Sequence, residues 1–251
     1  MKGVILAGGT GSRLLPLTRV TNKHLLHIYN KPMIFYPIET LKKSGIEDIL
    51  VVTGVHHAGS IFTLLGSGRE FGVNFTYRVQ DEAGGIPQAI GLARKFVGYD
   101  KFVSINGDNI LFEDIGSFVR EFERGSEEAR ILLYETTPEE ARKAGVAIME
   151  GERVARIVEK PAYPPSNLVS IGVLMFTPGV FDIIDTLRPS ARGELEISDV
   201  QNEYISRGTL RASKLSGTWL DAGSIEELER VNRIVAERAK NNSLKSAYDH
   251  E

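Results

Sequence analysis

Short apolar runs alternate with longer amphipathic segments in the first half of the chain. Three runs rich in Val and Ile have the length of buried strands, namely residues 2–7, 48–53 and 101–105. Helical patterns lie between them, over residues 32–44, 60–65 and 83–97. Strands that alternate with helices predict βαβ units. We therefore expect an α/β fold with a mostly parallel central sheet and helices on both faces.

The second half of the chain has a different pattern, in which strands follow one another closely. Residues 146–150 and 154–158 flank Gly151 and Glu152 and predict a β-hairpin. Two further strands are expected, at residues 168–176 and 209–215. The hairpin forms a small subregion beside the main sheet in this interpretation.

Two helices of the second half are predicted from their ends. Residues 198–207 fit a helix with Ser198 as its N-cap and Gly208 just past its end. The sequence SIEE at 224–227 is a capping-box pattern, and apolar residues at helical spacing follow it. Residues 241–251 are polar and predict a frayed tail. Because no repeat or linker interrupts the chain, we expect one continuous domain over residues 1–240.

Composition narrows the class of protein. The hydrophobic fraction of 42% and the charged fraction of 25% are those of an ordinary globular chain. Thirty Lys and Arg against 33 Asp and Glu give a net charge of −3, which argues against a general nucleic-acid or membrane-surface binder. The absence of Cys excludes a disulfide scaffold, a thiolate nucleophile and a Cys-ligated metal centre. No segment predicts a membrane span or a signal peptide, so a cytoplasmic protein is expected.

A glycine-rich loop follows the first predicted strand, with the sequence LAGGTGSRL at residues 6–14. Glycines at 8, 9 and 11 let the backbone turn tightly and bring its N–H groups close to an anion. Arg13 adds a guanidinium that can grip phosphate oxygens in a fork. The loop is not a Walker A motif, because no Gly-Lys-Ser/Thr follows the glycines. It is not a dinucleotide fingerprint either, because Leu14 stands where a third small residue is needed. By itself the loop could also be no more than a tight turn between a strand and a helix.

Two acidic residues stand at positions where an α/β sheet binds ligands. Asp108 follows a predicted strand in NGDN (106–109) and should project from the carboxyl end of the sheet. Asp221 lies in WLDAG (219–223), just before the capped helix. Two hard carboxylates suit Mg²⁺, which prefers oxygen ligands and keeps water or substrate phosphates around it. Either residue taken alone would more often be a turn or capping residue.

These motifs together resemble the signature of the sugar-phosphate nucleotidyltransferases, in particular the glucose-1-phosphate thymidylyltransferases. That signature has the form LAGGxG(T/S)RLxPLT, followed by a Lys before two leucines and then by Lys-Pro-Met. Here the chain reads LAGGTGSRLLPLT at 6–18, NKHLL at 22–26 and YNKPM at 29–33. The resemblance implies a Rossmann-like fold of the nucleotide-diphospho-sugar transferase type. It also divides the chain into a nucleotide-binding half, residues 1–110, and a sugar-phosphate-binding half, residues 111–240.

The resemblance assigns roles in nucleotide binding. It implies that Arg13 and Lys23 are catalytic and stabilise the triphosphate and the leaving group. Asp108 and Asp221 would hold Mg²⁺ beside the α-phosphate. The sequence VQDEAGGIPQA at 79–89 resembles the base-binding loop of the thymidylyl enzymes. The implied nucleotide-binding residues are Leu6, Ala7, Gly8, Gly9, Gly11, Gln80, Gly85 and Asp108, of which Gln80 would present its amide to a pyrimidine edge.

A second set of motifs implies a sugar 1-phosphate site. EKP at 159–161 would otherwise be read as solvated surface, but in the family Glu159 would bond sugar hydroxyls and Lys160 would neutralise the sugar phosphate and act in catalysis. Gly145, in AGV at 144–146, would donate its backbone N–H to the sugar. Arg192 begins the run RGELEI, which matches the thymidylyltransferase pattern without a change, and would be a second phosphate contact.

The reaction implied is attack of a sugar-1-phosphate oxygen on the α-phosphorus of a nucleoside triphosphate. The expected partners are dTTP or UTP and a sugar 1-phosphate, without nucleic acid or membrane, in a homo-oligomer. His24 and His27 replace a Gln and a Pro of the family pattern, which leaves the choice of nucleotide open. Thirty residues follow Asp221, fewer than in the long thymidylyltransferases, whose extra carboxyl-terminal helices are associated with feedback inhibition and oligomer contacts, so feedback regulation stays open here.

Two readings from other classes are weighed against this one. A catalytically silent homologue that senses nucleotides should have lost a residue of the phosphate site, yet all five of these are present: Arg13, Lys23, Asp108, Lys160 and Asp221. A dinucleotide-dependent oxidoreductase is disfavoured because the glycine fingerprint is incomplete. Thymine and uracil differ by one methyl group, worth about 1 kcal/mol of burial, so the sequence leaves dTTP and UTP both open.

Overall fold

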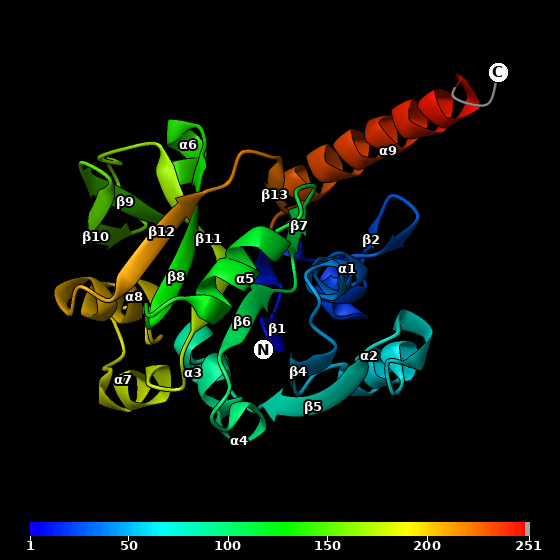
Figure 1. Cartoon of the computed structure of the whole chain (residues 1–251). Helices are drawn as coiled ribbons and strands as arrows, with labels where there is room; N and C mark the ends of the chain where they lie inside the picture. The colour runs from blue at the N-terminus through cyan, green and yellow to red at the C-terminus, as the bar shows by residue number, and fades with distance from the viewer. Residues whose placement is uncertain (249–251) are drawn as a thin grey trace.

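Four parallel strands form the amino-terminal part of the sheet in the computed structural model, which describes the backbone of residues 1–248 and the side chains of residues 1–241. Strand β1 (Lys2–Ala7) lies between β4 (Asp48–Gly54) and β6 (Phe102–Asn106), and β5 (Asn74–Gln80) pairs with β4. All three pairings are parallel, and Ile5 lies in register with Val51 on one side and Ile105 on the other. The predicted βαβ half of the chain is confirmed, with the sheet at the centre of the molecule (Figure 1).

The sheet changes direction at β11 (Leu168–Phe176), which pairs antiparallel with β6. Strand β11 also pairs antiparallel with β8 (Ala129–Glu135), and β12 (Leu210–Lys214) adds to β8 in parallel. At its other end β11 carries the hairpin of β9 (Gly145–Glu150) and β10 (Arg153–Glu159). The nine strands therefore form one mixed sheet, whose main path is β10-β9-β11-β6-β1-β4-β5.

Helices cover both faces of this sheet because successive residues of a strand point to opposite sides. Ile5 of β1 packs in one cluster with side chains of helices α1, α2 and α5, whereas Val4 packs in the other cluster with α3, α4, α7 and α8. The helices span α1 (Phe35–Lys43), α2 (Ala58–Leu65), α3 (Ile86–Gly91), α4 (Arg94–Val97), α5 (Gly116–Arg124), α6 (Pro138–Ala141), α7 (Val180–Thr186), α8 (Ile197–Ser206) and α9 (Ile225–Tyr248). The expected arrangement of layers is confirmed.

Small elements close the carboxyl edge of the sheet. Strand β7 (Asn109–Leu111) pairs with β13 (Trp219–Asp221), and β2 (His27–Ile28) pairs with β3 (Lys31–Pro32). Four 3-10 helices punctuate the loops, at Ser12–Leu14, Leu17–Arg19, Lys23–Leu25 and Arg69–Phe71. A third apolar cluster joins the first turns of α9 to these elements, and the rest of α9 projects away from the body (Figure 1). The pairing of β7 with β13 is what brings two distant parts of the chain, each with an Asp, to one edge.

Three helix predictions need correction. The predicted helix 83–97 is two helices, α3 and α4, separated after Gly91. Helix α8 begins at Ile197 with Glu196 as its N-cap, so Ser198 lies in the first turn and is buried there instead of capping. Helix α9 continues to Tyr248 through most of the predicted polar tail, and residues 249–251 lie outside the described residues.

The capping box at the start of α9 forms only in part. The Ser224 hydroxyl accepts the backbone N–H of Glu227 at 3.3 Å, as predicted. The Glu227 side chain, which should return to the Ser224 backbone, bonds Lys143 instead. Glu227 therefore connects the start of α9 to Lys143, which follows α6.

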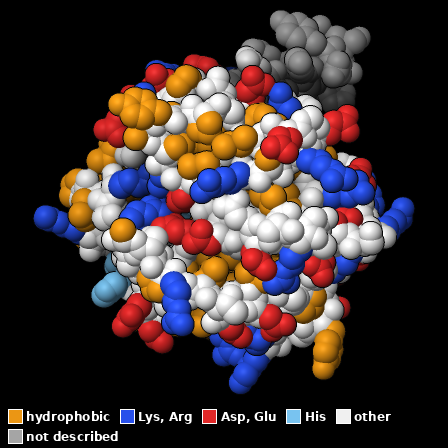
Figure 2. All heavy atoms as spheres, turned by 90° about the vertical axis from the view of Figure 1, so that its left-hand side faces the viewer, with side chains coloured by type: hydrophobic (Ala, Val, Ile, Leu, Met, Phe, Trp, Pro, Cys, Tyr) orange, Lys and Arg blue, Asp and Glu red, His pale blue; other side chains and the backbone are white. Residues whose placement is uncertain are grey.

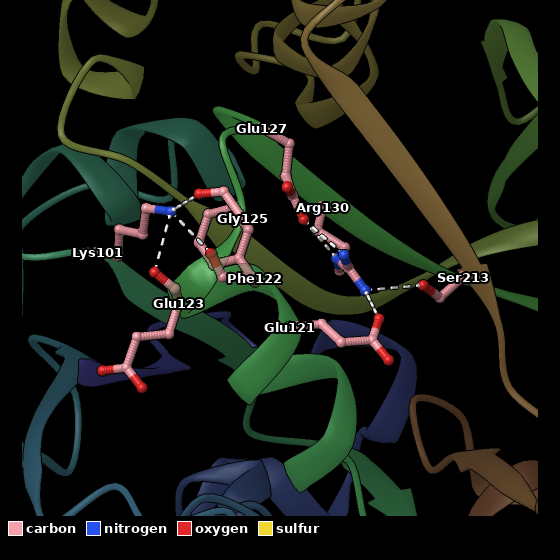
Figure 3. A network of polar contacts seen from close by, with 8 residues as sticks. All are labelled: Lys101, Glu121, Phe122, Glu123, Gly125, Glu127, Arg130 and Ser213. Carbon is pink, nitrogen blue, oxygen red and sulfur yellow. Dashed lines mark hydrogen bonds and ion pairs between the residues drawn. The ribbon is translucent and has the colours of Figure 1, made fainter.

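Beneath the second half of the sheet, Arg130 lies in a buried ionic network (Figure 3). Its guanidinium donates to the carboxylate of Glu127 at 2.5 Å and to that of Glu121 at 2.6 Å. A third bond reaches the hydroxyl of Ser213 on β12. Burial opposes ionisation of Glu127, but the hydrogen bonds from Arg130 outweigh it and lower the pKa of that carboxyl. The network links α5, β8 and β12.

The charged side chains on one face of the molecule are mixed in sign, as the net charge of −3 suggests (Figure 2). On the face formed around β12, α7 and α8, basic and acidic side chains are interspersed among apolar ones, without a continuous basic field over the described residues (Figure 2). Within residues 1–248, no helix has both the length and the apolar character needed to cross a bilayer.

Candidate active site

A cavity of about 710 Å³ opens at the carboxyl ends of β1 and β6 and extends beneath the β9–β10 hairpin. All but two of the predicted site residues line it: Leu6, Gly8, Gly9, Arg13, Lys23, Gln80, Gly85, Asp108, Gly145, Glu159, Lys160, Arg192 and Asp221. Residues from the predicted nucleotide half and from the predicted sugar-phosphate half thus face one space. Open α/β sheets bind ligands at this edge.

Ala7 and Gly11 are the two predicted residues that do not line the cavity. The Ala7 side chain is fully buried in the core, and its carbonyl accepts a hydrogen bond from Asn22. Gly11 has φ 66° and a Cβ there would lie 2.8 Å from Thr18, so glycine is required for the turn. Thr18 also donates to the Gly11 carbonyl. Both residues shape the loop and do not wall the cavity.

Lys23 and Asp108 form the most buried ion pair of the cavity, with Nζ 2.5 Å from Oδ2. Asp108 sits in the tight turn between β6 and β7, while Lys23 begins a 3-10 helix capped by the Asn22 side chain. Burial has the largest single effect and would raise the pKa of the Asp108 carboxyl, but the charge and hydrogen bond of Lys23, together with smaller contributions from His24 and the backbone, hold that pKa well below its usual value. Asp108 is therefore ionised, and Lys23 directs its ammonium into the site.

Asp221 is the second carboxylate, placed at the end of β13 in register with Asn109. Burial and then the negative charge of Asp108 raise its pKa to about 7, against an opposing effect of Lys23. The two carboxylates therefore repel each other, and a cation between them would relieve that repulsion. Among the described residues no group of three or more His, Cys, Asp or Glu side chains could hold a metal. A pair of carboxylates that leaves most positions to water and phosphate fits Mg²⁺, as the sequence predicts.

The Glu159, Lys160 and Arg192 side chains lie together in another part of the cavity lining. Arg192 donates to Glu159 at 3.3 Å and also pairs with Glu196, which is nearly buried and accepts the Ser190 hydroxyl. These partners raise the pKa of the Arg192 guanidinium, first through the hydrogen bonds that it donates to Glu196. The Lys160 ammonium lies 3.6 Å from Glu159 and is about half exposed.

The backbone holds Lys160 in a rare conformation. Its φ is 39°, in the left-handed region that side chains other than glycine seldom adopt. Its N–H donates to the Ala144 carbonyl at 3.0 Å, which fixes the residue beside Gly145. Strain of this kind persists where the surrounding structure imposes it, and it is common at functional sites.

The predicted base loop begins after Gln80 and packs against Leu195, which is distant in the sequence. Gly85 has φ 98°, and a Cβ there would lie 2.2 Å from the Leu195 carbonyl, so only glycine fits. The Leu195 N–H donates to the Gly84 carbonyl at 2.9 Å. This bond joins the base loop to the loop that carries Arg192.

His24 and His27, which depart from the family pattern, have different surroundings. His24 is 1% exposed and lies against Gly107, where a Cβ would be 2.5 Å from its ring. Burial and the adjacent Lys23 lower its pKa to about 3, so the ring is neutral and its Nδ1 bonds the Asn22 side chain. His24 therefore supports the turn that carries Asp108. His27 is exposed in β2.

Several cavity residues were not predicted. Besides His24, eight of them are polar or aromatic: Arg142, Lys143, Asn106, Asn109, Ser170, Glu194, Gln201 and Trp219. The signal that could have revealed the first pair is the two adjacent basic residues just before Gly145. Trp219 belongs to the same run as Asp221, and its indole N–H donates to Asn109 at 2.9 Å. Gln201 is nearly buried on α8, far from any motif in the sequence.

The carboxylates, cations and glycine-rich loop at the end of an α/β sheet define an enzyme that handles phosphate groups. The chain belongs to the nucleotidyl transferase family, whose profile matches residues 2–238. It is 42% identical to the low-salt glycan biosynthesis nucleotidyltransferase Agl11 of Haloferax volcanii and 37% identical to the glucose-1-phosphate thymidylyltransferase of Streptomyces griseus. Each alignment covers 94% of this chain and 66% of the relative, so the chain spans just under two thirds of their length.

A solved structure shows the same fold. It is assigned as a glucose-1-phosphate thymidylyltransferase from Bacillus anthracis and contains sucrose. The two structures superpose with a TM-score of 0.89 at 49% identity, over 93% of this chain and 94% of the other. The recognition of a sugar-phosphate nucleotidyltransferase from the sequence motifs is therefore confirmed.

Proposed function

We propose that the protein condenses a nucleoside triphosphate, with dTTP favoured, and glucose 1-phosphate to give dTDP-glucose and pyrophosphate. The observation that carries this proposal is the presence of two phosphate-binding sets in one cavity. Arg13 and Lys23 line this cavity beside the glycine-rich loop, and Lys160 and Arg192 line it at the end of β10 and in the loop before α8. The relatives named as thymidylyltransferases support this choice of substrates.

The chemistry that these residues support is direct displacement at the α-phosphorus. A phosphate oxygen of the sugar substrate is already anionic at neutral pH, so it attacks without a general base. Its new bond to phosphorus forms as the bond to pyrophosphate breaks. Catalysis then depends on alignment and on stabilising negative charge. Lys160 and Arg192 hold the attacking phosphate in line, while Arg13 and Lys23 stabilise the departing one.

Asp108 and Asp221 would hold Mg²⁺ in this enzyme. When bound, the ion neutralises phosphate charge and orients the triphosphate. Lys23, bonded to Asp108, is then positioned next to the same phosphates. Glu159, which fixes Arg192, is placed to accept sugar hydroxyls.

The experiment that tests the proposal is pyrophosphate release from glucose 1-phosphate with Mg²⁺ and, separately, dTTP, UTP, ATP, GTP and CTP. Release with dTTP or UTP is expected, and the ratio of their kcat/KM values decides which is the preferred nucleotide. Release with a purine triphosphate alone would overturn the assignment of the base loop. The Asp108→Asn variant serves as the control. Silence with all five triphosphates and with a panel of other sugar phosphates would leave a nucleotide-binding protein without this activity.

A further inference from the structure

Two glutamine side chains form a hydrogen-bond relay beside the base loop. The backbone N–H of Gly84 donates to Oε1 of Gln88 at 2.9 Å, and Nε2 of Gln80 donates to the same oxygen at 2.7 Å. Gln80 is 7% exposed at the end of β5, and Gln88 lies in the first turns of α3. Gln80 Nε2 also lies 3.5 Å from the Gly85 carbonyl. The Gln80 amino group thus has two acceptors on the loop side.

The relay fixes the orientation of both amides. A backbone N–H can only donate, so the atom of Gln88 that faces Gly84 must be its oxygen. The atom of Gln80 that faces this oxygen must then be the amino nitrogen. Turning either amide over would place two oxygens or two N–H groups against each other, at the cost of a buried hydrogen bond.

The Gln80 oxygen consequently faces the cavity. A Cβ on Gly8 would lie 2.2 Å from this oxygen, which places it directly against the glycine-rich loop. Among the described residues no group donates a hydrogen bond to it, whereas the amino group of the same side chain is fully engaged. The wall of the cavity therefore presents a single fixed acceptor at this point.

We propose that Gln88 is a positioning residue that sets base selection by holding Gln80 as a hydrogen-bond acceptor. This inference rests on the proposed function for the identity of the base site. A fixed acceptor favours a base whose ring nitrogen carries a proton, as in the imide of uracil or thymine. The corresponding nitrogen of cytosine carries a lone pair, which would face the Gln80 oxygen without a proton between them.

Loss of the Gln88 oxygen would weaken this preference, because only the 3.5 Å contact with the Gly85 carbonyl would then hold the Gln80 amino group. Gln80 could then rotate its amide and present its amino group to cytosine, so discrimination would fall even though the base contact residue is unchanged. A Met at position 88 keeps a similar length without an acceptor. A Glu keeps the acceptor, because a carboxylate receives both the Gly84 N–H and the Gln80 amino group.

The test compares wild type, Gln88→Met and Gln88→Glu by kcat/KM for UTP and for CTP with glucose 1-phosphate. We expect the UTP preference to fall by about tenfold or more in Gln88→Met, with CTP use rising, and to persist in Gln88→Glu. If Gln88 only supports the fold, Gln88→Met lowers use of both nucleotides alike and leaves their ratio unchanged. That result would overturn the inference.

Calorimetric binding of UDP and CDP to the same three proteins separates this inference from the proposed function. If no sugar phosphate is turned over, the proposed function fails, and the binding ratios still report on Gln88. Wild type that binds UDP and CDP equally would overturn the inference, as would a Gln88→Met variant that keeps the wild-type binding ratio.

Discussion

The Lys143 ammonium lies 2.7 Å from Oε1 of Glu227, so a cation on the rim of the cavity is tied to the first turn of α9. This hydrogen bond raises the pKa of Lys143. Glu227 is 5% exposed, and among the described residues its second oxygen has no hydrogen-bond partner. Lys143 is thus the principal group that compensates a nearly buried carboxylate while it also faces the substrate space.

Replacing Lys143 by Met should affect both binding and stability. The KM for the phosphate substrates should rise by roughly tenfold, and the free energy of unfolding should fall by about 1–3 kcal/mol, because Glu227 is left buried without its cation. Urea unfolding and steady-state kinetics measure the two effects. Glu227→Gln is the matched control, since it keeps the cation and should retain most of the affinity. Equal stability and KM in Lys143→Met and wild type would contradict this reading.

The Asp221 carboxyl should make the metal-free protein less stable at higher pH. Its pKa is raised to about 7 in the folded chain, so the stability it contributes is present below about pH 4 and is lost as the pH rises through 7. Asp221→Asn should remove this loss and exceed wild type by roughly 1–3 kcal/mol at pH 8, while abolishing nucleotidyl transfer. Chemical unfolding in EDTA at several pH values measures the difference.

Added Mg²⁺ should reduce that difference, because a cation that binds only the native wild type stabilises it by mass action. Unfolding curves of the two proteins that run parallel from pH 4 to pH 8 in EDTA would show that Asp221 is not under electrostatic strain.

Lys160 should be a site where function costs stability. Because φ is 39° there, Lys160→Gly should relieve backbone strain and raise the free energy of unfolding by about 1 kcal/mol. The same change removes an ammonium from the sugar-phosphate wall and should raise the KM for glucose 1-phosphate far more than that for the triphosphate. Lys160→Ala is the control, because it loses the charge and keeps the strain. An unchanged KM for glucose 1-phosphate in both variants would argue against the assigned role.

The buried network around Arg130 should be important for folding and irrelevant to substrate choice. Arg130→Met leaves the Glu127 carboxylate buried beside an apolar chain and should cost about 3 kcal/mol or more in urea unfolding. Adding Glu127→Gln should restore at least about 1 kcal/mol, since the uncompensated charge is then absent. If Arg130→Met alone lowers the free energy of unfolding by less than about 1 kcal/mol, the Glu127 carboxylate is compensated by water or by a local rearrangement, and the prediction is wrong.

The strands of this protein were the elements most open to prediction. The strands predicted at residues 2–7 and 168–176 have the same bounds in the structure. Their apolar runs are informative because a buried strand needs apolar side chains on both faces. The polar positions of β5 hide a strand at the edge of the sheet, where one face is solvated. The start of α8 was missed for another reason: Glu196 occupies the N-cap position without a capping hydrogen bond, and its carboxylate accepts from Arg192 instead, a contact set by tertiary structure.

The candidate site was predictable where chemistry follows a local motif. Asp108 and Asp221 each sit in a short run with a recognisable place after a strand, and the structure brings both to one edge through the pairing of β7 with β13. Gln201 reaches the cavity only because α8 packs as it does, so no local pattern marks it. Likewise, the orientation of the Gln80 amide depends on Gln88 eight residues away.

The β9–β10 hairpin joins the rest of the sheet through only two register pairs, Val169 with Val146 and Ser170 with Gly145. The phosphate groups of the triphosphate, in contrast, would rest on β1 and β6, which are embedded among central strands. If the proposed function holds, insertions or substitutions in the hairpin should alter which sugar is accepted while leaving nucleotide binding unchanged. In a search for a new sugar nucleotide, we expect the exposed positions of the hairpin to be the ones to vary, while its buried side chains, which pack against α8, and the central strands are kept.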